Sequence, residues 1–246
     1  MRYALFSDIH SNLEAFRAVR EALKKESIDR FICIGDIVGY GADPGECIRQ
    51  VRELKADVVA GNHDYAAVGK TSIARFNSYA QEAALWTRAQ LNPSERDFLA
   101  GLELIKEYPD FAIVHAALDE PEKWHYILRT PDAQNNFHLL NKRILFIGHS
   151  HVPSVFEETM GNNAEPQCRP FFKEQINLKA GCRYIINIGS VGQPRDGDPR
   201  ASFAIYDTER EEVQIRRVNY DVAIASDKIL KAGLPEKLAY RIIQGK

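Results

Sequence analysis

Five separate segments of the chain carry side chains that bind metals, and each follows a short apolar run. The side chains are carboxylates, imidazoles and one amide, and they belong to Asp8, His10, Asp36, Asn62, His63, His115, His149 and His151. In an open α/β sheet, the loops after the strands lie along one edge, where ligands bind. We therefore expect the five segments to meet in one site.

The motifs differ in how specific they are. Asp8-x-His10 in a loop is more often a local hydrogen-bonding pair than a ligand pair. Gly61-Asn62-His63-Asp64 is more specific, because Gly permits a sharp turn after a strand and Asn supplies a neutral oxygen ligand. Gly148-His149-Ser150-His151 places two imidazoles close enough for two neighbouring ions. The other two histidines, His125 and His138, lie in a polar region and are interpreted as surface or structural residues.

The ligand types favour a transition metal. Mixed nitrogen and carboxylate ligands suit Mn²⁺, Fe or Zn²⁺, whereas Mg²⁺ and Ca²⁺ prefer coordination by oxygen alone. We expect Mn²⁺ first, with Fe, Zn²⁺ or Ni²⁺ as alternatives.

Strands and helices alternate in the first quarter of the chain. The apolar runs Arg2–Phe6 and Phe31–Ile34 are typical of strands that are covered on both faces. A helix capped by Asn12 connects the first strand to the second. A helix at 46–54 connects the second strand to a third, at 57–60. Right-handed crossovers make these three strands parallel.

Residues 65–107 interrupt this alternation. Two helical patterns, at 73–91 and 94–106, predict a helical insertion beside the site. Strands are then expected at Phe111–Val114, which ends before His115, and at Arg143–Ile147, which ends before His149. A polar loop and a short helix are expected between them.

The chain after His151 is rich in short strand patterns. Strands are expected at 153–158, 169–176, 183–188, 201–207 and 212–218, with a hairpin turn at Gly161-Asn162-Asn163. We expect these strands to form a second sheet that packs on the first. Two helices, at about 221–231 and 235–243, complete the chain.

Length and composition indicate one domain over residues 1–246, since 45% hydrophobic residues can bury a full core. The net charge of −2 gives no argument for a nucleic-acid or membrane surface. The chain shows no signal-peptide pattern and no apolar segment of membrane length, which predicts a cytoplasmic protein. Its four cysteines form no CxxC motif, so we expect free thiols.

Together, the motifs resemble those of the calcineurin-like metallophosphoesterases in order and spacing: Asp8-x-His10, Gly35-Asp36, Gly61-Asn62-His63-Asp64, His115 and Gly148-His149-x-His151. The likeness is closer to the small bacterial and archaeal phosphodiesterase branch that includes YfcE, because Gly189–Asp196 and Gly233-Leu234-Pro235 also fit it. The resemblance implies a four-layer α/β/β/α sandwich of two mixed sheets with outer helices.

The resemblance also implies roles for individual residues. It places Asp8, His10, Asp36 and His151 on one divalent ion and Asp36, Asn62, His115 and His149 on a second, with Asp36 as the bridge. It makes His63 a catalytic residue that binds no metal and Asp64 the residue that orients its ring. Asn62, Ser190 and Arg195 are the expected contacts to substrate. Ser150, Ile188 and Ala116-Ala117 depart from the branch pattern, which bears on substrate choice more than on chemistry.

The implied function is hydrolysis of a small phosphate ester through a metal-activated hydroxide, most simply by a phosphodiesterase. A phosphomonoesterase and a dinucleotide polyphosphate hydrolase stay open. A non-catalytic metal-binding scaffold of the same fold is a second reading, and the presence of His63 counts against it. A DNA nuclease is a third, disfavoured by the near-neutral charge and the lack of a basic stripe with interleaved aromatics. Neither the substrate nor the oligomeric state is readable from the sequence.

Overall fold

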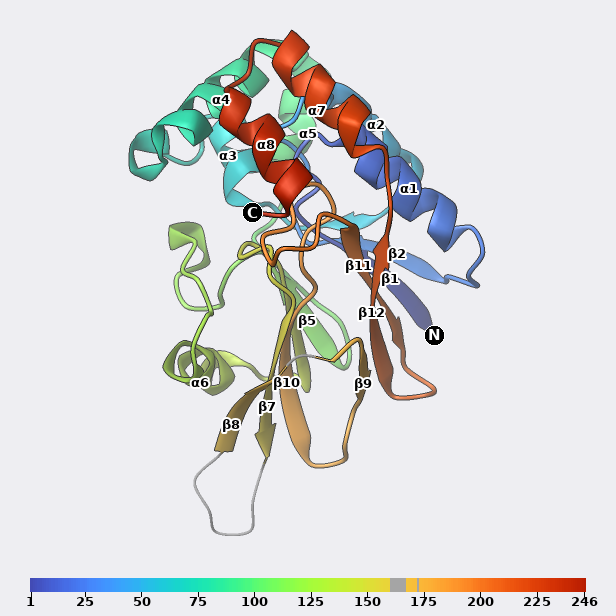
Figure 1. Cartoon of the computed structure of the whole chain (residues 1–246). Helices are drawn as coiled ribbons and strands as arrows, with labels where there is room; N and C mark the ends of the chain where they lie inside the picture. Colours follow the sequence, from blue (N-terminus) through green and yellow to red (C-terminus); the bar gives the residue numbers. More distant parts are fainter. Residues whose placement is uncertain (160–166, 172) are drawn as a thin grey trace.

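Two six-stranded mixed sheets form the centre of the molecule in the computed structural model, which describes residues 1–159, 167–171 and 173–246 (Figure 1). The first sheet has the order β3 (Asp57–Val58), β2 (Arg30–Cys33), β1 (Arg2–Phe6), β11 (Ala201–Asp207), β12 (Glu212–Val218) and β9 (Gln175–Asn177). The second has the order β4 (Ile105–Glu107), β5 (Phe111–Val114), β6 (Ile144–Ile147), β10 (Cys182–Asn187), β7 (Ser154–Thr159) and β8 (Gln167–Phe171).

Parallel strands lie together within each sheet. The first three strands, β1, β2 and β3, are parallel, as the alternating pattern predicted. In the second sheet β5, β6 and β10 are parallel. The carboxyl ends of both parallel sets carry the metal-type residues.

Helices cover the outer faces of both sheets. They are α1 (Leu13–Leu23), α2 (Pro44–Glu53), α3 (Asn62–Ala67), α4 (Ser78–Gln90), α5 (Pro93–Ala100), α6 (Thr130–Leu139), α7 (Val222–Lys231) and α8 (Glu236–Gln244), with short 3₁₀ turns η1 (Ile73–Arg75) and η2 (Pro121–Lys123). In Figure 1, α6 lies beside the second sheet, whereas α1 and α2 lie beside the first.

Side-chain alternation along the strands builds the layers. On β1, Tyr3 and Leu5 face the core between the sheets, whereas Ala4 and Phe6 face the core beneath α1. Phe111 and Ile113 of β5 face the same inner core, and Ala112 and Val114 face α6. A strand with apolar residues on both faces fits only a sheet that is covered on both sides. The predicted four-layer α/β/β/α sandwich is thereby confirmed.

The predicted partition of the C-terminal strands is wrong. They do not form a separate second sheet, because β11, β12 and β9 continue the first sheet and only β7, β8 and β10 join the second. β11 pairs with β1, and its residues from Ala201 to Tyr206 are all buried. A strand that is buried along this length needs a central position in its sheet.

The predicted strand at 169–176 is divided between β8 and β9, which lie in different sheets. The predicted turn at 161–163 lies outside the described residues.

The helical insertion begins earlier and ends earlier than predicted. Helix α3 starts at Asn62, inside the segment expected to be a turn. The predicted helix 94–106 ends at Ala100, where Gly101 provides the C-cap, and Ile105–Glu107 forms an edge strand against β5. The assignment of residues 1–246 to one domain stays a prediction.

Candidate metal centre

The metal-type residues of all five segments meet where the parallel strands of both sheets end. Asp8 and His10 follow β1, Asp36 follows β2, Asn62 and His63 begin α3 after β3, His115 follows β5, and His149 and His151 follow β6. Backbone bonds join these loops: the amide of Asp8 donates to Gly35 (3.0 Å) and the amide of Gly148 donates to His115 (2.9 Å). The site therefore spans two neighbouring sheets rather than the edge of one.

Five of the candidate ligands adopt left-handed backbone conformations. The φ angles are 54° at Asp8, 49° at His10, 51° at Asp36, 65° at His149 and 61° at His151. Asp and His tolerate this region better than most residues, yet it costs about 1–3 kcal/mol at each position. Such strain persists only where the surrounding structure imposes it, and it clusters at functional sites.

Two imidazole nitrogens face each other in the first ligand group. Nδ1 of His10 lies 3.1 Å from the Val38 carbonyl, and Nδ1 of His151 lies 2.5 Å from the Gln193 carbonyl. A carbonyl only accepts, so both Nδ1 atoms donate and both Nε2 atoms carry lone pairs. These two Nε2 atoms are 3.1 Å apart. Oδ1 of Asp8 lies 3.1 Å from Nε2 of His151. Three electron-pair donors at these distances repel one another unless a cation lies among them.

Asp36 joins this group to a second one. Nδ1 of His115 donates to the Ile34 carbonyl (2.7 Å), which leaves its Nε2 free to coordinate. Nε2 of His149 donates to the Trp124 carbonyl (3.0 Å), which leaves its Nδ1 free. Oδ2 of Asp36 lies 3.3 Å from Nε2 of His115 and 3.5 Å from Nε2 of His10. One carboxylate oxygen therefore touches both groups, which is the position of a bridging ligand.

Buried polar atoms without partners indicate what the site accepts. Among the described residues, Oδ1 of Asp8, Oδ1 of Asn62 and Nε2 of His115 are buried and make no hydrogen bond. An unpaired buried polar atom costs about 1–3 kcal/mol, more if charged. Oδ1 of Asp8 lies 3.9 Å from Nε2 of His115. Carboxylate, amide and imidazole donors of this kind fit divalent transition-metal ions.

The histidines of the cluster have pKa values that are shifted in opposite directions. Although burial opposes its charged form, Asp36 and Asp8 raise the pKa of His115 to about 10. Burial, with His115 nearby, lowers the pKa of His149 to about 3, and burial with Arg195 nearby does the same for His151. Of these three histidines, His115 is therefore the one whose positive charge the two carboxylates favour.

His63 lines the cavity beside the ligands. Its ring packs against Tyr40 (4.3 Å between centroids) and Phe76 (4.9 Å), and its backbone amide donates to Oδ1 of Asp36 (2.8 Å). Nδ1 is buried without a partner in the described structure, so Nε2 is the nitrogen available to the cavity. Burial holds the pKa of His63 well below its usual value.

Asp64 does not orient the ring of His63, contrary to the sequence-based expectation. Its carboxylate accepts the backbone amides of Gly61 (3.0 Å) and Val38 (3.2 Å) instead. Burial and the Asp36 charge raise the pKa of Asp64 to about 7. Asp64 therefore fixes the backbone at the start of α3, and the position of His63 follows from that.

The two residues expected after β10 have different surroundings. Arg195 lines the cavity, where its guanidinium donates to Oε1 of Gln193 (2.8 Å) and lies 5.8 Å from the centre of the Tyr40 ring. Ser190 does not reach the cavity, because its hydroxyl is buried, donates to the Asp8 carbonyl (2.9 Å) and accepts from the Gln193 amide (2.8 Å). Ser190 ties its loop to the Asp8 loop.

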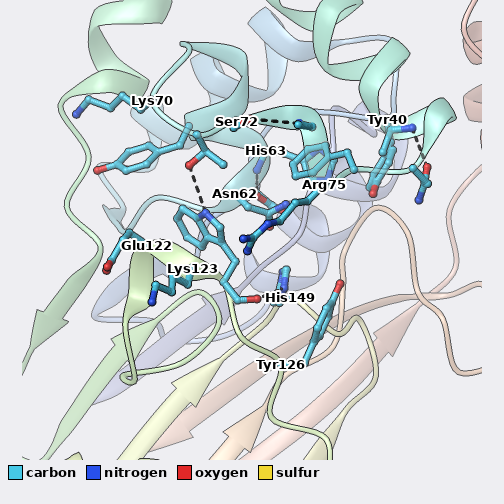
Figure 2. Close-up of a pocket in the computed structure, with 18 of the residues that line it drawn as sticks. Tyr40, Asn62, His63, Lys70, Ser72, Arg75, Glu122, Lys123, Tyr126 and His149 are labelled. Atoms are coloured by element: carbon cyan, nitrogen blue, oxygen red, sulfur yellow. Dashed lines mark hydrogen bonds between the residues drawn. The ribbon is translucent and has the colours of Figure 1, made fainter.

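A cavity of about 720 Å³ opens above these groups (Figure 2). Aromatic residues that the sequence analysis did not single out line it, among them Tyr65, Phe76, Trp124 and Tyr126. Trp124 holds His149 through its carbonyl, and Tyr126 stacks on the His149 ring at 4.1 Å. In the sequence, Trp124 and Tyr126 stand out only as two aromatic residues in an otherwise polar segment. The contact from the Trp124 carbonyl to His149 could not be predicted, because a backbone carbonyl has no sequence signature.

Comparison with known protein families identifies the family of this chain. The model of the calcineurin-like phosphoesterase superfamily domain matches residues 1–211. The chain belongs to this superfamily. Membership in this superfamily supports a metal-dependent hydrolase of phosphoric esters. The expected family is confirmed.

Similar proteins span the whole chain. An uncharacterised protein of Methanocaldococcus jannaschii, MJ0912, is 40% identical over 99% of this chain and 98% of its own. The crystal structure of a metallophosphoesterase from Sphaerobacter thermophilus is 38% identical, with a TM-score of 0.85 over 100% of this chain and 99% of that one. The hypothetical protein PH1004 from Pyrococcus horikoshii has the same fold, with a TM-score of 0.80 and 20% identity over 100% and 98% of the two chains.

Other expectations concern the surroundings of the site. His125 and His138 are exposed, as their interpretation as surface residues requires. Cys33, Cys47 and Cys182 are free, buried thiols. Within the described residues, the helices are too short or too polar to cross a membrane.

Gly148→Ala will weaken metal binding without touching a ligand. A Cβ atom at this position would collide with Oγ of Ser7 and Oδ2 of Asp8. Displacing a ligand in this way typically lowers metal affinity by about 10–100-fold. Titration calorimetry with Mn²⁺ measures the change, and Gly101→Ala, at an exposed helix end, is the matched control. Equal Mn²⁺ affinity in the parent and Gly148→Ala would contradict this role of Gly148.

Proposed function

We propose that the protein is a binuclear metal-dependent phosphodiesterase that acts on a small phosphate ester. The observation that carries the proposal is the position of Asp36, whose Oδ2 lies within 3.5 Å of one imidazole from each ligand group. Both groups lie at the base of a cavity that also exposes His63. The site therefore combines two places for cations, a nearby proton donor and room for an ester.

In this proposal Asp8, His10, Asp36 and His151 hold one ion, and Asp36, Asn62, His115 and His149 hold the other. Mn²⁺ is the first choice for both, with Fe, Zn²⁺ or Ni²⁺ as alternatives. Two such ions, when bound, lower the pKa of a shared water and neutralise the phosphoryl oxygens. Three imidazoles, His10, His115 and His151, are held by Nδ1–H donation to backbone carbonyls and His149 by Nε2–H donation. The geometry of all four rings is thus fixed before metal arrives.

The residues around the ions have separate tasks. Nε2 of His63 faces the cavity, where it protonates the leaving oxygen or stabilises its charge. Asp64 positions His63 by fixing the start of α3. The guanidinium of Arg195 lines the cavity and is suited to a phosphoryl oxygen. The hydroxyl of Ser190 is engaged with the backbone of Asp8 and Gln193, so Ser190 holds the Asp8 loop in place rather than contacting substrate.

The size and lining of the cavity favour a phosphodiesterase over a phosphomonoesterase or a non-catalytic scaffold. Its volume of about 720 Å³ is larger than one phosphoryl group needs, which favours a diester over a monoester. A non-catalytic scaffold has no use for a histidine whose Nε2 faces the cavity beside two ligand groups. A cytoplasmic location is also part of the proposal.

Chelation followed by reloading tests the proposal. We expect two Mn²⁺ per chain by elemental analysis, loss of activity after chelation, and recovery when Mn²⁺ returns. A panel of phosphomonoesters, phosphodiesters and dinucleoside polyphosphates, assayed at each stage, identifies the ester class. A stoichiometry that stays below one ion per chain at saturating Mn²⁺ would overturn the binuclear site.

A further inference from the structure

The cavity extends beyond the candidate metal ligands, since Lys70, Arg75 and Lys123 also line it. Its volume of about 720 Å³ lies in the range of small-molecule sites, about 300–1,000 Å³, and far exceeds one phosphoryl group. Figure 2 shows Lys70 and Lys123 at one side of the cavity and Tyr40 and Tyr126 at the other. The substrate can therefore extend from the metal centre toward Lys70.

Arg75 lines this region as a cation whose side chain has no hydrogen-bonding or ionic partner among the described residues. Nζ of Lys70 donates to the Ala100 carbonyl (2.5 Å), and Lys123 is ion-paired with Glu120. Arg75 lines the cavity, is exposed, and makes neither a hydrogen bond nor an ion pair with the described part of the chain. Its five N–H donors are available to a ligand.

The backbone that carries Arg75 is held in place. Ser72 caps η1 by accepting from the Ala74 amide (3.3 Å), and Asn77 caps α4 by accepting from the Ala80 amide (3.0 Å). Between them, Phe76 packs on the His63 ring at 4.9 Å. The turn is thus tied to the catalytic histidine, and Figure 2 shows the Arg75 side chain directed into the cavity.

We propose that Arg75 binds a second phosphate of the substrate, so that the preferred substrates carry a phosphate beyond the one that is hydrolysed. This inference rests on the proposed phosphodiesterase function. The hydrolysed phosphoryl group has His63, Arg195 and the metal-bearing residues to meet it, whereas Arg75 comes from the exposed turn between Ser72 and Asn77 and adds a further cation to the cavity. A guanidinium matches phosphate with two parallel hydrogen bonds, and the aromatic walls strengthen them by excluding water.

A matched pair of esters tests the inference. Thymidine 5′-(4-nitrophenyl phosphate) and its 3′-phosphorylated form differ only in the second phosphate, and both release nitrophenolate when the diester is cleaved. We expect the Mn²⁺-loaded parent to cleave the 3′-phosphorylated ester with a kcat/KM at least about tenfold higher, mainly through a lower KM. Calorimetry with thymidine 3′,5′-bisphosphate and thymidine 5′-monophosphate gives the same comparison without turnover.

Arg75→Gln should remove this preference. We expect its kcat/KM to fall roughly 10–100-fold for the 3′-phosphorylated ester, as is typical for loss of a charged hydrogen bond, and to stay within about threefold for the other ester. Arg75→Lys, which keeps the charge but not the paired donors, should retain part of the preference. Arg210→Gln is the control, because this exposed arginine lies between β11 and β12, outside the cavity lining, and both esters should be cleaved as by the parent.

Three results would overturn the inference in distinguishable ways. If the parent cleaves both esters equally well, the second phosphate is not recognised, while the proposed function stands. If Arg75→Gln slows both esters equally, Arg75 acts on the hydrolysed phosphoryl group. If neither ester is cleaved and neither product binds, the proposed function and the inference fail together.

Discussion

Asp36→Asn will release both metal ions and abolish hydrolysis, whereas His151→Ala will mainly weaken one ion. Oδ2 of Asp36 lies 3.5 Å from Nε2 of His10 and 3.3 Å from Nε2 of His115, so its charge serves both ligand groups. It also offsets the mutual repulsion of two cations, which is strong in a buried site. We expect the Mn²⁺ affinity of Asp36→Asn to fall by more than the roughly 10–100-fold typical of residues that only support a ligand.

Elemental analysis after dialysis measures this effect, with circular dichroism to show that the fold is retained. Asp57→Asn is a suitable control, because Asp57 lies at the start of β3, away from the ligands, and accepts a hydrogen bond from Tyr108 (3.0 Å). It should keep two ions. Metal retention in Asp36→Asn equal to that of the parent would show that Asp36 is not the bridge.

His63→Ala will leave metal content unchanged while slowing hydrolysis by an amount that depends on the leaving group. If His63 donates a proton, esters of alkoxides need it, whereas nitrophenolate leaves readily without one. General acid catalysis is worth about 10²–10⁴-fold, and we expect a deficit of that size for alkyl esters and a much smaller one for nitrophenyl esters.

A series of diesters with leaving groups of increasing pKa separates the two roles of His63. The exposed His125 provides the control, since His125→Ala removes an imidazole outside the cavity lining. A deficit that is the same across the series, with chemistry shown to be rate-limiting, would reject proton donation and leave electrostatic stabilisation of the phosphoryl group.

Much of the fold was predictable because strands buried on both faces carry a distinct pattern. Continuous apolar runs such as Arg2–Phe6 and Phe111–Val114 indicated their strands correctly. The pattern does not say which strand is the neighbour, however, because pairing depends on contacts between distant segments. β11 pairs with β1 across some two hundred residues of chain, and the expectation of a separate C-terminal sheet was wrong for that reason.

The candidate ligands were predictable for a chemical reason. Carboxylates and imidazoles directly after buried strands are rare, because burying such groups is costly unless they are used. The structure brings Asp8, Asp36 and His115 together as that argument required. The expected contact between Asp64 and the His63 ring failed, because adjacency in sequence does not fix side-chain direction at the start of a helix.

By itself, the sequence determined which residue types follow which strands, and from that the family, the layered fold and the set of candidate ligands. Only the tertiary structure decided which nitrogen of each histidine faces the site, since that depends on carbonyls such as those of Val38 and Trp124, far away along the chain. It also decided that Arg75 and Trp124 line the cavity above the metal centre. Neither follows a strand, so their positions arise only from the packing of the insertion and the 120–126 loop against the two sheets.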